Sequence, residues 1–506
     1  MFSMHRLFAF LALVTVFVLP FAAWADAAEE ARLKDIFSKI IATQNTEAAA
    51  HGSEFITEGD IQIEDAGNYY AVTLPLAKLK TKDGNVLDIG MIAINASPQA
   101  QAGTWKMTIA LPTPFVMKDA AGAPLMSLAI GSQNVTGIWN ESLAAFTTLN
   151  ASYGDLKVED TGKAFSGTLA KLAFSADLKE ASPGKWSGPM MTRLDGLSVS
   201  IPGKQMKIGL KWGEMKFDLS GYNLAALKGS DMKDPATIIG ALAKNAEGLR
   251  SALNVQEFEV IAPQPGQEAM GKFALEKGNF TLALSGLSQD KVAAQIGLDY
   301  RGLDPKPLNE QLQNLLPHEA KLNWQLNNVP LQKLTATVQN TLGAVNTVSP
   351  AMPQMGAMAL MMKLPALLSE AQTSMTVEKN YVSNDLYRAE LEGTVKSDIT
   401  AFTGFISDFM LGVYGLDNLI VALENAAAIP TTMYRSELRS LASNLKYFKG
   451  FAVQKKDEQG TNMHSYHFEI TPQGQFLLND KDAAALLSGN VLPPVGGEAA
   501  PVAPAQ

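Results

Sequence analysis

The chain has 506 residues, no cysteine, 47% hydrophobic residues, and 41 basic against 50 acidic side chains. The absence of cysteine excludes disulfide-stapled small domains, Cys-ligated zinc, iron–sulfur clusters and thiol catalysis. The net charge of -9 disfavours nucleic-acid binding, and the hydrophobic content is high enough for a buried core.

Residues 1–25 have the pattern of a cleavable secretory signal peptide. A short basic start precedes an apolar stretch over 7–19, and Ala23-Trp24-Ala25 matches the A-x-A cleavage motif. We therefore expect cleavage after Ala25. A secreted chain of this length without cysteine is typical of the periplasm of Gram-negative bacteria, and it offers no cysteine for lipid attachment.

We expect no transmembrane span after cleavage. The most apolar later stretch, 351–368, contains Pro353, Lys363 and Pro365, which break it well short of the roughly 20 apolar residues that a membrane helix needs.

The pattern of hydrophobic residues divides the mature chain into four regions. We expect an N-terminal β-rich domain over 26–230, a mixed helix and strand region over 231–372, and a C-terminal α+β region over 373–488. The Pro-, Gly- and Ala-rich segment 489–506 has the composition of a disordered tail.

The first element is an amphipathic helix over 27–43, because apolar residues recur there at a spacing of three to four. Alternation with period two follows and predicts strands. The alternating runs are 70–76, 105–111, 206–212, 215–219, 273–275, 280–284, 296–300, 322–326, 466–470 and 476–478. We expect short turns between 212 and 215 and at Glu276–Asn279, which would make 273–284 a hairpin. Further turn signals lie at 82–85, 102–103, 183–184, 202–203 and 471–474.

Helical spacing also returns between and after these strands. The predicted later helices are Asp234–Ala252, Lys306–Leu316, Leu331–Leu342, Met355–Gln372, Ile399–Ala427 and Arg435–Leu445. The pattern over Ile399–Ala427 is the strongest, and Gly412 or Gly415 would split it. The predicted fold class is therefore α+β and β-rich: large antiparallel sheets built from hairpins, with packed amphipathic helices and a helical C-terminal portion.

Few residues carry reactive chemistry. The one close histidine pair, His464 and His467, has a spacing that puts the two rings on opposite faces of a strand, so we predict no metal site there. Motifs for nucleotide binding, serine acyl enzymes and zinc proteases are missing. We predict no catalytic residue, no metal and no cofactor. A carboxylate-based hydrolase stays open, since it needs only two acidic residues.

One cluster favours contact with apolar material. Met352, Met355, Met358, Met361 and Met362 share one broad face of a helix, and methionine adapts to irregular apolar partners. A buried core helix is the alternative interpretation of this spacing. A sheet with one apolar face also allows both interpretations, because helices, a second sheet or a ligand can cover that face.

Three segments resemble a known family: Leu197–Gly209, Leu322–Leu331 and His467–Asp480. They are similar to an uncharacterised family of alphaproteobacterial envelope proteins, defined as a domain of unknown function, and the likeness covers most of 27–488. The pattern of alternating strand segments is also similar to that of AsmA-like envelope proteins, which build β-rich lipid-handling grooves. That group usually retains an N-terminal membrane helix, whereas residues 1–25 here look cleavable.

We therefore expect a non-enzymatic periplasmic protein of the cell envelope that binds or handles lipid or another hydrophobic ligand. The first alternative is a structural or partner-binding envelope factor without a ligand. The second is the carboxylate-based hydrolase.

Overall fold

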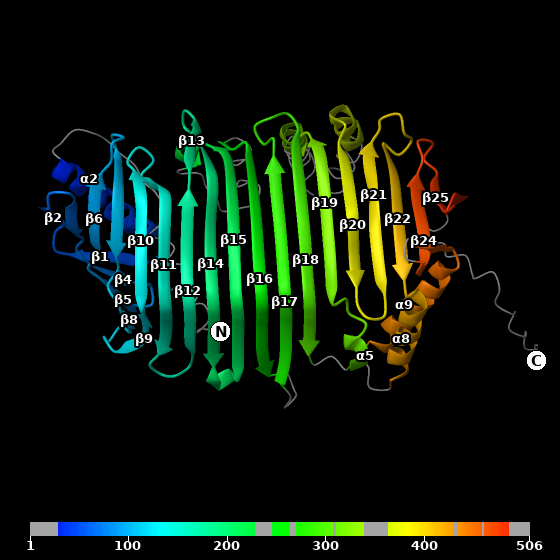
Figure 1. The fold of residues 1–506 in the computed structure, drawn as a ribbon, viewed down its shortest axis with the longest axis horizontal. Coiled ribbons are helices and arrows are strands. Elements are labelled where there is room, and N and C mark those ends of the chain that lie inside the picture. Colours follow the sequence, from blue (N-terminus) through cyan, green and yellow to red (C-terminus); the bar gives the residue numbers. More distant parts are fainter. Residues whose placement is uncertain are drawn as a thin grey trace, which may run out of the picture. The chain divides into compact units, whose positions relative to one another are not determined.

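The structure is a computed structural model, and it describes residues 29–227, 245–263, 270–306, 310–338, 363–429, 434–457 and 460–484. Of these residues, 57% are in strands and 19% in helices, and every described strand pairing is antiparallel (Figure 1). The expectation of a β-rich chain built from antiparallel strands is confirmed.

The chain divides into two compact units, Met1–Gln289 with Arg301–Pro307, and Asp290–Tyr300 with Leu308–Gln506. The three regions expected from the sequence, 26–230, 231–372 and 373–488, stay predictions. The first unit begins with helix α2 (Glu29–Ala50) and eleven strands. These are β1 (Glu54–Glu58), β2 (Gln62–Asp65), β3 (Tyr70–Thr73), β4 (Leu76–Lys80), β5 (Val86–Gly90), β6 (Ala93–Pro98), β7 (Thr104–Ala110), β8 (Phe115–Lys118), β9 (Pro124–Ala129), β10 (Ser132–Asn140) and β11 (Ala145–Asp160).

Longer elements complete this unit: β12 (Ser166–Asp177), β13 (Lys179–Ser182), β14 (Lys185–Ile201), the turn η1 (Pro202–Lys204), β15 (Met206–Tyr222), the short helix α3 (Leu224–Leu227), β16 (Gly248–Pro263) and β17 (Met270–Ser285). Strands β11, β12, β14, β15, β16 and β17 pair consecutively and run side by side in Figure 1. Strand β18 (Val292–Lys306) contributes residues to both units.

The sheet forks at β11. One half of β11 pairs with β10, which leads through β7, β6 and β3 to β2. The end of β11 pairs with β9, which leads through β8, β5 and β4 to β1. These two branches and α2 enclose the largest hydrophobic core, which includes Leu33, Phe37, Ile94 and Trp105.

The long strands of this unit share one irregularity, which we call the bulge row. Asp155 in β11, Gly196 in β14 and Glu257 in β16 have positive φ angles of 51°, 67° and 48°. At this row, each pair of neighbouring strands skips one residue on both strands, and the pairing then continues in the same register. For example, Gly154 pairs with Lys171 and Leu156 pairs with Leu169, so Asp155 and Ala170 are skipped.

At the bulge row the inward-facing positions shift by one residue. The buried residues of β11 fall at 149, 151 and 153 and then at 156, and those of β12 fall at 167 and 169 and then at 172. Leu194 and Leu197 of β14 pack against the same core. Each strand therefore keeps its apolar side chains on one face, although the alternation of apolar and polar residues in its sequence shifts by one position at this row.

This phase change corrects two sequence predictions. The expected turn between 212 and 215 lies inside β15, and the expected hairpin at Glu276–Asn279 lies inside the continuous strand β17. Both predictions were wrong because a shift in alternation looks like a turn when only one strand is considered. The turns expected at 82–85, 102–103, 183–184, 202–203 and 471–474 all lie between strands and are confirmed.

The second unit contains five consecutively paired strands, β19 (Glu319–Val329), β20 (Ser374–Ser383), β21 (Arg388–Ser397), β22 (Phe405–Tyr414) and β24 (Asn462–Ile470). Its other elements are α5 (Glu310–Gln313), helical segments 331–338 and 363–371, α8 (Leu416–Ala428), α9 (Arg435–Lys449), β23 (Val453–Lys456), β25 (Phe476–Leu478) and β26 (Lys481–Asp482). Its core gathers Val413, Leu416, Ile420 and Tyr466.

The strongest helix prediction, Ile399–Ala427, is wrong in its first half. Residues Phe405–Tyr414 form strand β22, and only Leu416–Ala428 is helical, with Gly415 as the N-cap residue at φ 65°. Gly415 therefore ends the strand and begins the helix. The expected helix Asp234–Ala252 is also wrong from Gly248 onward, where β16 begins.

The other helix predictions hold in whole or in part over the described residues; in Lys306–Leu316, Lys306 ends strand β18 and only Glu310–Gln313 is helical. Helix α2 covers most of the expected 27–43 and extends to Ala50, and α9 covers Arg435–Leu445 and extends to Lys449. Helical turns also fall within Lys306–Leu316, Leu331–Leu342 and Met355–Gln372. The predicted signal peptide 1–25 and tail 489–506 lie outside the described residues.

Candidate binding cavity

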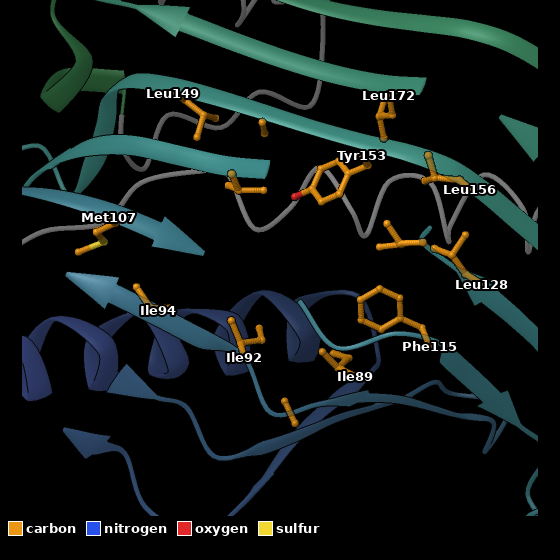
Figure 2. Close-up of a cluster of buried hydrophobic side chains, with 14 of the residues drawn as sticks. Ile89, Ile92, Ile94, Met107, Phe115, Leu128, Leu149, Tyr153, Leu156 and Leu172 are labelled. Atoms are coloured by element: carbon orange, nitrogen blue, oxygen red, sulfur yellow. The ribbon is translucent and has the colours of Figure 1, made fainter. Parts of the chain in front are cut away.

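The two branches of the first unit and helix α2 enclose a cavity of about 120 Å³. In Figure 2, Ile89, Ile92, Ile94 and Phe115 face Leu149 and Tyr153 of β11 across this space. Twenty of the 24 lining residues have apolar side chains, and the other four are Gln44, Thr57, Trp139 and Tyr153. Among the residues that the structure describes, no charged side chain lines it.

Helix α2 forms one wall of the cavity. Its apolar stripe predicts this role, since Leu33, Ile36 and Phe37 are buried, and Phe37, Ile40 and Ile41 line the space. A side-chain pair holds the start of the helix to the sheet: Arg32 donates from Nε to Glu141 Oε2 at 2.9 Å, and its Nη2 lies 2.8 Å from the same oxygen.

The far wall runs along β11. Its lining residues are Phe146, Leu149, Ala151 and Tyr153. Seven residue steps separate the first from the last, which corresponds to about 23 Å of strand. The cavity wall is therefore elongated, which suits a chain-like occupant better than a compact one.

One hydrogen-bond donor of a lining residue is fully buried without a partner among the described residues. The indole Nε1 of Trp139 is buried and unpaired, and Trp139 as a whole is 4% exposed. Burial raises the pKa of Tyr153, another lining residue, to about 12. By contrast Trp105, which pairs directly with Trp139 across β7 and β10, donates its indole N–H to Glu141.

The apolar face of β11 continues across the long strands. Direct pairing places six side chains in one row: Ala151, Phe174, Thr192, Met215, Leu253 and Phe280. The first lies in the cavity wall, whereas Met215, Leu253 and Phe280 are 38%, 38% and 42% exposed. Buried apolar surface at the cavity therefore passes into exposed apolar surface along the sheet.

The second unit has a larger but open depression of about 520 Å³. It is lined by exposed charged side chains of both signs, including Lys321, Glu378, Glu392 and Asp408. Water satisfies such groups, so this depression gives less reason to expect a ligand than the apolar cavity of the first unit.

The histidine pair is divided as its spacing predicts. His464 is buried and pairs with Val413, while Nε2 of His467, on the other face of β24, lies 3.1 Å from Asp408 Oδ1. Over the described ranges, no group of three or more His, Asp or Glu side chains is arranged to hold a metal ion.

The sequence-predicted contact residues Met352, Met355, Met358, Met361 and Met362 lie outside the described residues. The cavity residues were not singled out from the sequence. They come from α2 and from strands that lie as far along the chain as Tyr153, and each one looks like an ordinary core residue. The one available signal was the amphipathic helix 27–43 ahead of many short strands.

No family model, no curated protein and no solved structure matches this chain. Among the helices that the structure describes, none combines the length and apolar character needed to cross a membrane.

Proposed function

We propose that this protein binds the apolar chain of a lipid or a similar hydrophobic ligand in the cavity of its first unit. The observation that carries this proposal is the lining itself, in which 20 of 24 residues are apolar and none is charged. Transfer of an alkyl chain from water into such surroundings releases about 25 cal/mol per Å² of apolar surface buried.

The size of the cavity limits what enters without movement. A cavity of about 120 Å³ is close to the roughly 150 Å³ of engineered apolar cavities that admit benzene. A longer chain requires α2 to move outward or must continue along the exposed apolar row of β15–β17.

The proposed setting is the periplasm, and the proposed role is non-enzymatic. The setting rests on the signal-like residues 1–25 and on the absence of cysteine. The role rests on the cavity chemistry, because hydrolysis by paired carboxylates needs two acidic side chains at the site, and the lining has none.

A cavity-filling variant tests the proposal. Ala151→Leu places a larger side chain in the lining, and we expect at least a tenfold loss of affinity for the neutral fluorophore N-phenyl-1-naphthylamine. The matched control is Ala173→Leu, the same change on the other face of the neighbouring strand, where Ala173 pairs with Ser152. Thermal unfolding followed by circular dichroism verifies that both variants fold.

Equal fluorophore binding by the wild type and Ala151→Leu would place the fluorophore elsewhere. No binding by the wild type at any concentration below its solubility would remove the proposal.

The exposed apolar side chains favour a second function, docking of a protein partner. Met215, Leu253, Phe273 and Phe280 are each more than a third exposed, and exposed apolar surface of this kind marks interaction sites. A stoichiometric partner recovered by wild-type protein, and lost by a Leu253→Ser/Phe280→Ser double variant that still binds the fluorophore, would favour this function.

A further inference from the structure

The connection between β21 and β22 exposes two large apolar side chains to solvent. We call this connection, residues 398–404, the tip. Within it, Phe402 is 85% exposed and Ile399 is 66% exposed, which are the two highest exposed fractions among the described large apolar side chains. Single exposed apolar residues are ordinary on a protein surface. Two of them in one connection form an apolar patch, and such patches mark contact sites.

Hydrogen bonds hold the backbone of the tip in place. The backbone N–H of Asp398 donates to the carbonyl oxygen of Gly404 at 3.0 Å and closes the connection. Oδ1 of Asp398 accepts from the backbone N–H of Thr400 at 2.8 Å and from its hydroxyl at 2.7 Å. Ala401, in the middle of the tip, is buried. An ordered connection therefore presents the two apolar side chains, which reduces the conformational entropy lost when a partner buries them.

Neighbouring segments fix the two exposed residues themselves. The backbone N–H of Phe402 donates to the carbonyl oxygen of Pro472 at 3.0 Å, and that of Ile399 donates to Ser369 Oγ at 2.8 Å. Pro472 lies in the turn between β24 and β25, which reaches this end of the sheet because β22 and β24 pair antiparallel. The tip is thus supported by two segments from outside the hairpin.

The tip is nearly free of charge. Residues 398–404 and the neighbouring turn 471–475 contain one charged side chain, Asp398, and no Lys, Arg or His. The carboxylate of Asp398 is hydrogen-bonded to Thr400. An acidic partner therefore finds no cation in these two segments, whereas an apolar partner meets mainly hydrocarbon, hydroxyl and amide groups.

The area of the tip favours a lipid surface over a protein partner. Since a Phe side chain presents roughly 200 Å², the exposed fractions of Phe402 and Ile399 correspond to on the order of 300 Å² of apolar surface. A stable protein interface buries about 800 Å² on each partner. A lipid surface needs neither that area nor a matching shape, because each apolar side chain that enters the acyl region contributes by itself.

We propose that the tip inserts Phe402 and Ile399 into the acyl region of a phospholipid surface, so that this protein docks peripherally on a membrane. The docking does not depend on the cavity of the first unit, since the tip belongs to the second unit. Because the tip is nearly free of charge, the binding depends on apolar burial and not on the charge of the lipid.

Flotation with phospholipid vesicles tests the proposal on the secreted protein, after mass spectrometry has verified that residues 1–25 are absent. We expect the wild type to float with phosphatidylcholine vesicles. The affinity should change less than twofold between 0.1 and 0.5 M NaCl and should not rise when phosphatidylglycerol is included.

Two results of this experiment would overturn the proposal. The first is a wild-type protein that does not float with either kind of vesicle. The second is flotation that requires phosphatidylglycerol and disappears at high salt, because it would assign the binding to a charged surface outside the tip.

Serine variants assign the binding to the tip. Phe402→Ser should weaken vesicle binding about tenfold, because it removes a large apolar side chain from the lipid, and Ile399→Ser/Phe402→Ser should weaken it further. Val421→Ser is the matched control. Val421 is 54% exposed on α8, which begins after the far end of β22, and we expect a change within twofold. Vesicle binding by the double variant that equals that of the wild type would contradict the proposal.

Fluorescence reports insertion without reference to affinity. Phe402→Trp and Val421→Trp are each compared with the wild type on vesicles of phosphatidylcholine brominated on its acyl chains. We expect bromine to quench the added signal of Phe402→Trp and not that of Val421→Trp. An unquenched Phe402→Trp signal on vesicle-bound protein would show that the tip stays outside the acyl region.

Protein docking and cavity binding give different patterns. A stoichiometric protein partner that is lost in Phe402→Ser, together with no flotation of the wild type, would assign the tip to protein contact. In the absence of vesicles, Phe402→Ser should bind N-phenyl-1-naphthylamine as the wild type does. Failure of the wild type to bind this fluorophore contradicts the proposed function and leaves the flotation result unaffected.

Discussion

Tyr153 shows how one side chain links the cavity to stability. It is 6% exposed on β11, and burial alone raises its pKa to about 12 from the ordinary value of 10.0. A raised pKa means that the folded state holds the phenolic proton more tightly than the unfolded chain does. The contribution of this group is therefore fully present below pH 10 and is lost as the pH rises from about 10 to 12.

We expect the wild type to lose more unfolding free energy than Tyr153→Phe between pH 9 and pH 11.5. Urea unfolding at pH 7, 9, 10.5 and 11.5 measures the difference in unfolding free energy between the two proteins. The contributions of other buried tyrosines, such as Tyr466, are the same in both proteins and cancel in this difference. Parallel pH profiles would show that Tyr153 titrates in the folded state as it does in the unfolded chain.

At the scale of elements, α2 forms one wall of the cavity. Its contacts with the sheet include the ion pair Arg32–Glu141 and a hydrogen bond from the Tyr70 hydroxyl to Glu29 Oε2 at 2.9 Å. Both lie in the N-terminal half of the helix. The C-terminal half contributes Ile40, Ile41 and Gln44 to the lining, so outward movement there would open the cavity.

Arg32→Gln should loosen this wall. The pair is half-buried, so we expect a loss of about 1 kcal/mol in stability and severalfold faster association with N-phenyl-1-naphthylamine in stopped-flow fluorescence. Lys34→Gln is the control, since it removes the same charge from an exposed position on the same helix. Equal association rates in both variants would show that the cavity fills without movement at the Arg32 contact.

At the scale of the whole first unit, the bulge row keeps six long strands in one register. Gly196 has φ 67°, and a Cβ there would lie 2.9 Å from Ala170 Cβ on the neighbouring strand. A β-branched residue at this position would destabilise the fold for two reasons: it disfavours the left-handed backbone conformation, and its Cβ would be too close to Ala170 Cβ.

Gly196→Val should therefore lower the free energy of unfolding by about 2 kcal/mol or more. Gly209→Val on β15 is the control, since no heavy atom lies within 4 Å of its added Cβ, and we expect a change within about 0.5 kcal/mol. Urea unfolding measures both variants. Equal stability of the two would mean that the row tolerates side chains.

The same row explains where sequence reasoning succeeded and where it failed. Alternation correctly predicts that β15 and β17 are strands, because each face repeats every second residue. Alternation alone cannot distinguish a shift of the apolar positions by one residue from a turn. The shift in β17 lies opposite Glu257 of β16, which has a positive φ angle, and the sequence of β17 alone does not reveal this pairing.

The prediction of a helix over strand β22 was wrong for another reason. Phe405, Ile406, Phe409 and Met410 are apolar on both faces of the strand, so their spacing also fits a helix. Aromatic and β-branched residues favoured a strand, but the pattern merged with the true helix α8. The cavity was beyond prediction, because a gap in packing depends on how distant elements meet and leaves no local pattern.

The constant register across the bulge row limits how this protein can change during evolution. An insertion or deletion of one residue in any of β12, β14, β15 or β16 would misalign that strand with both of its neighbours. Length changes are therefore confined to connections such as Pro202–Lys204, or must occur in adjacent strands together. The unit can lengthen by whole hairpins at its turns, whereas the apolar path along its strands keeps a fixed length.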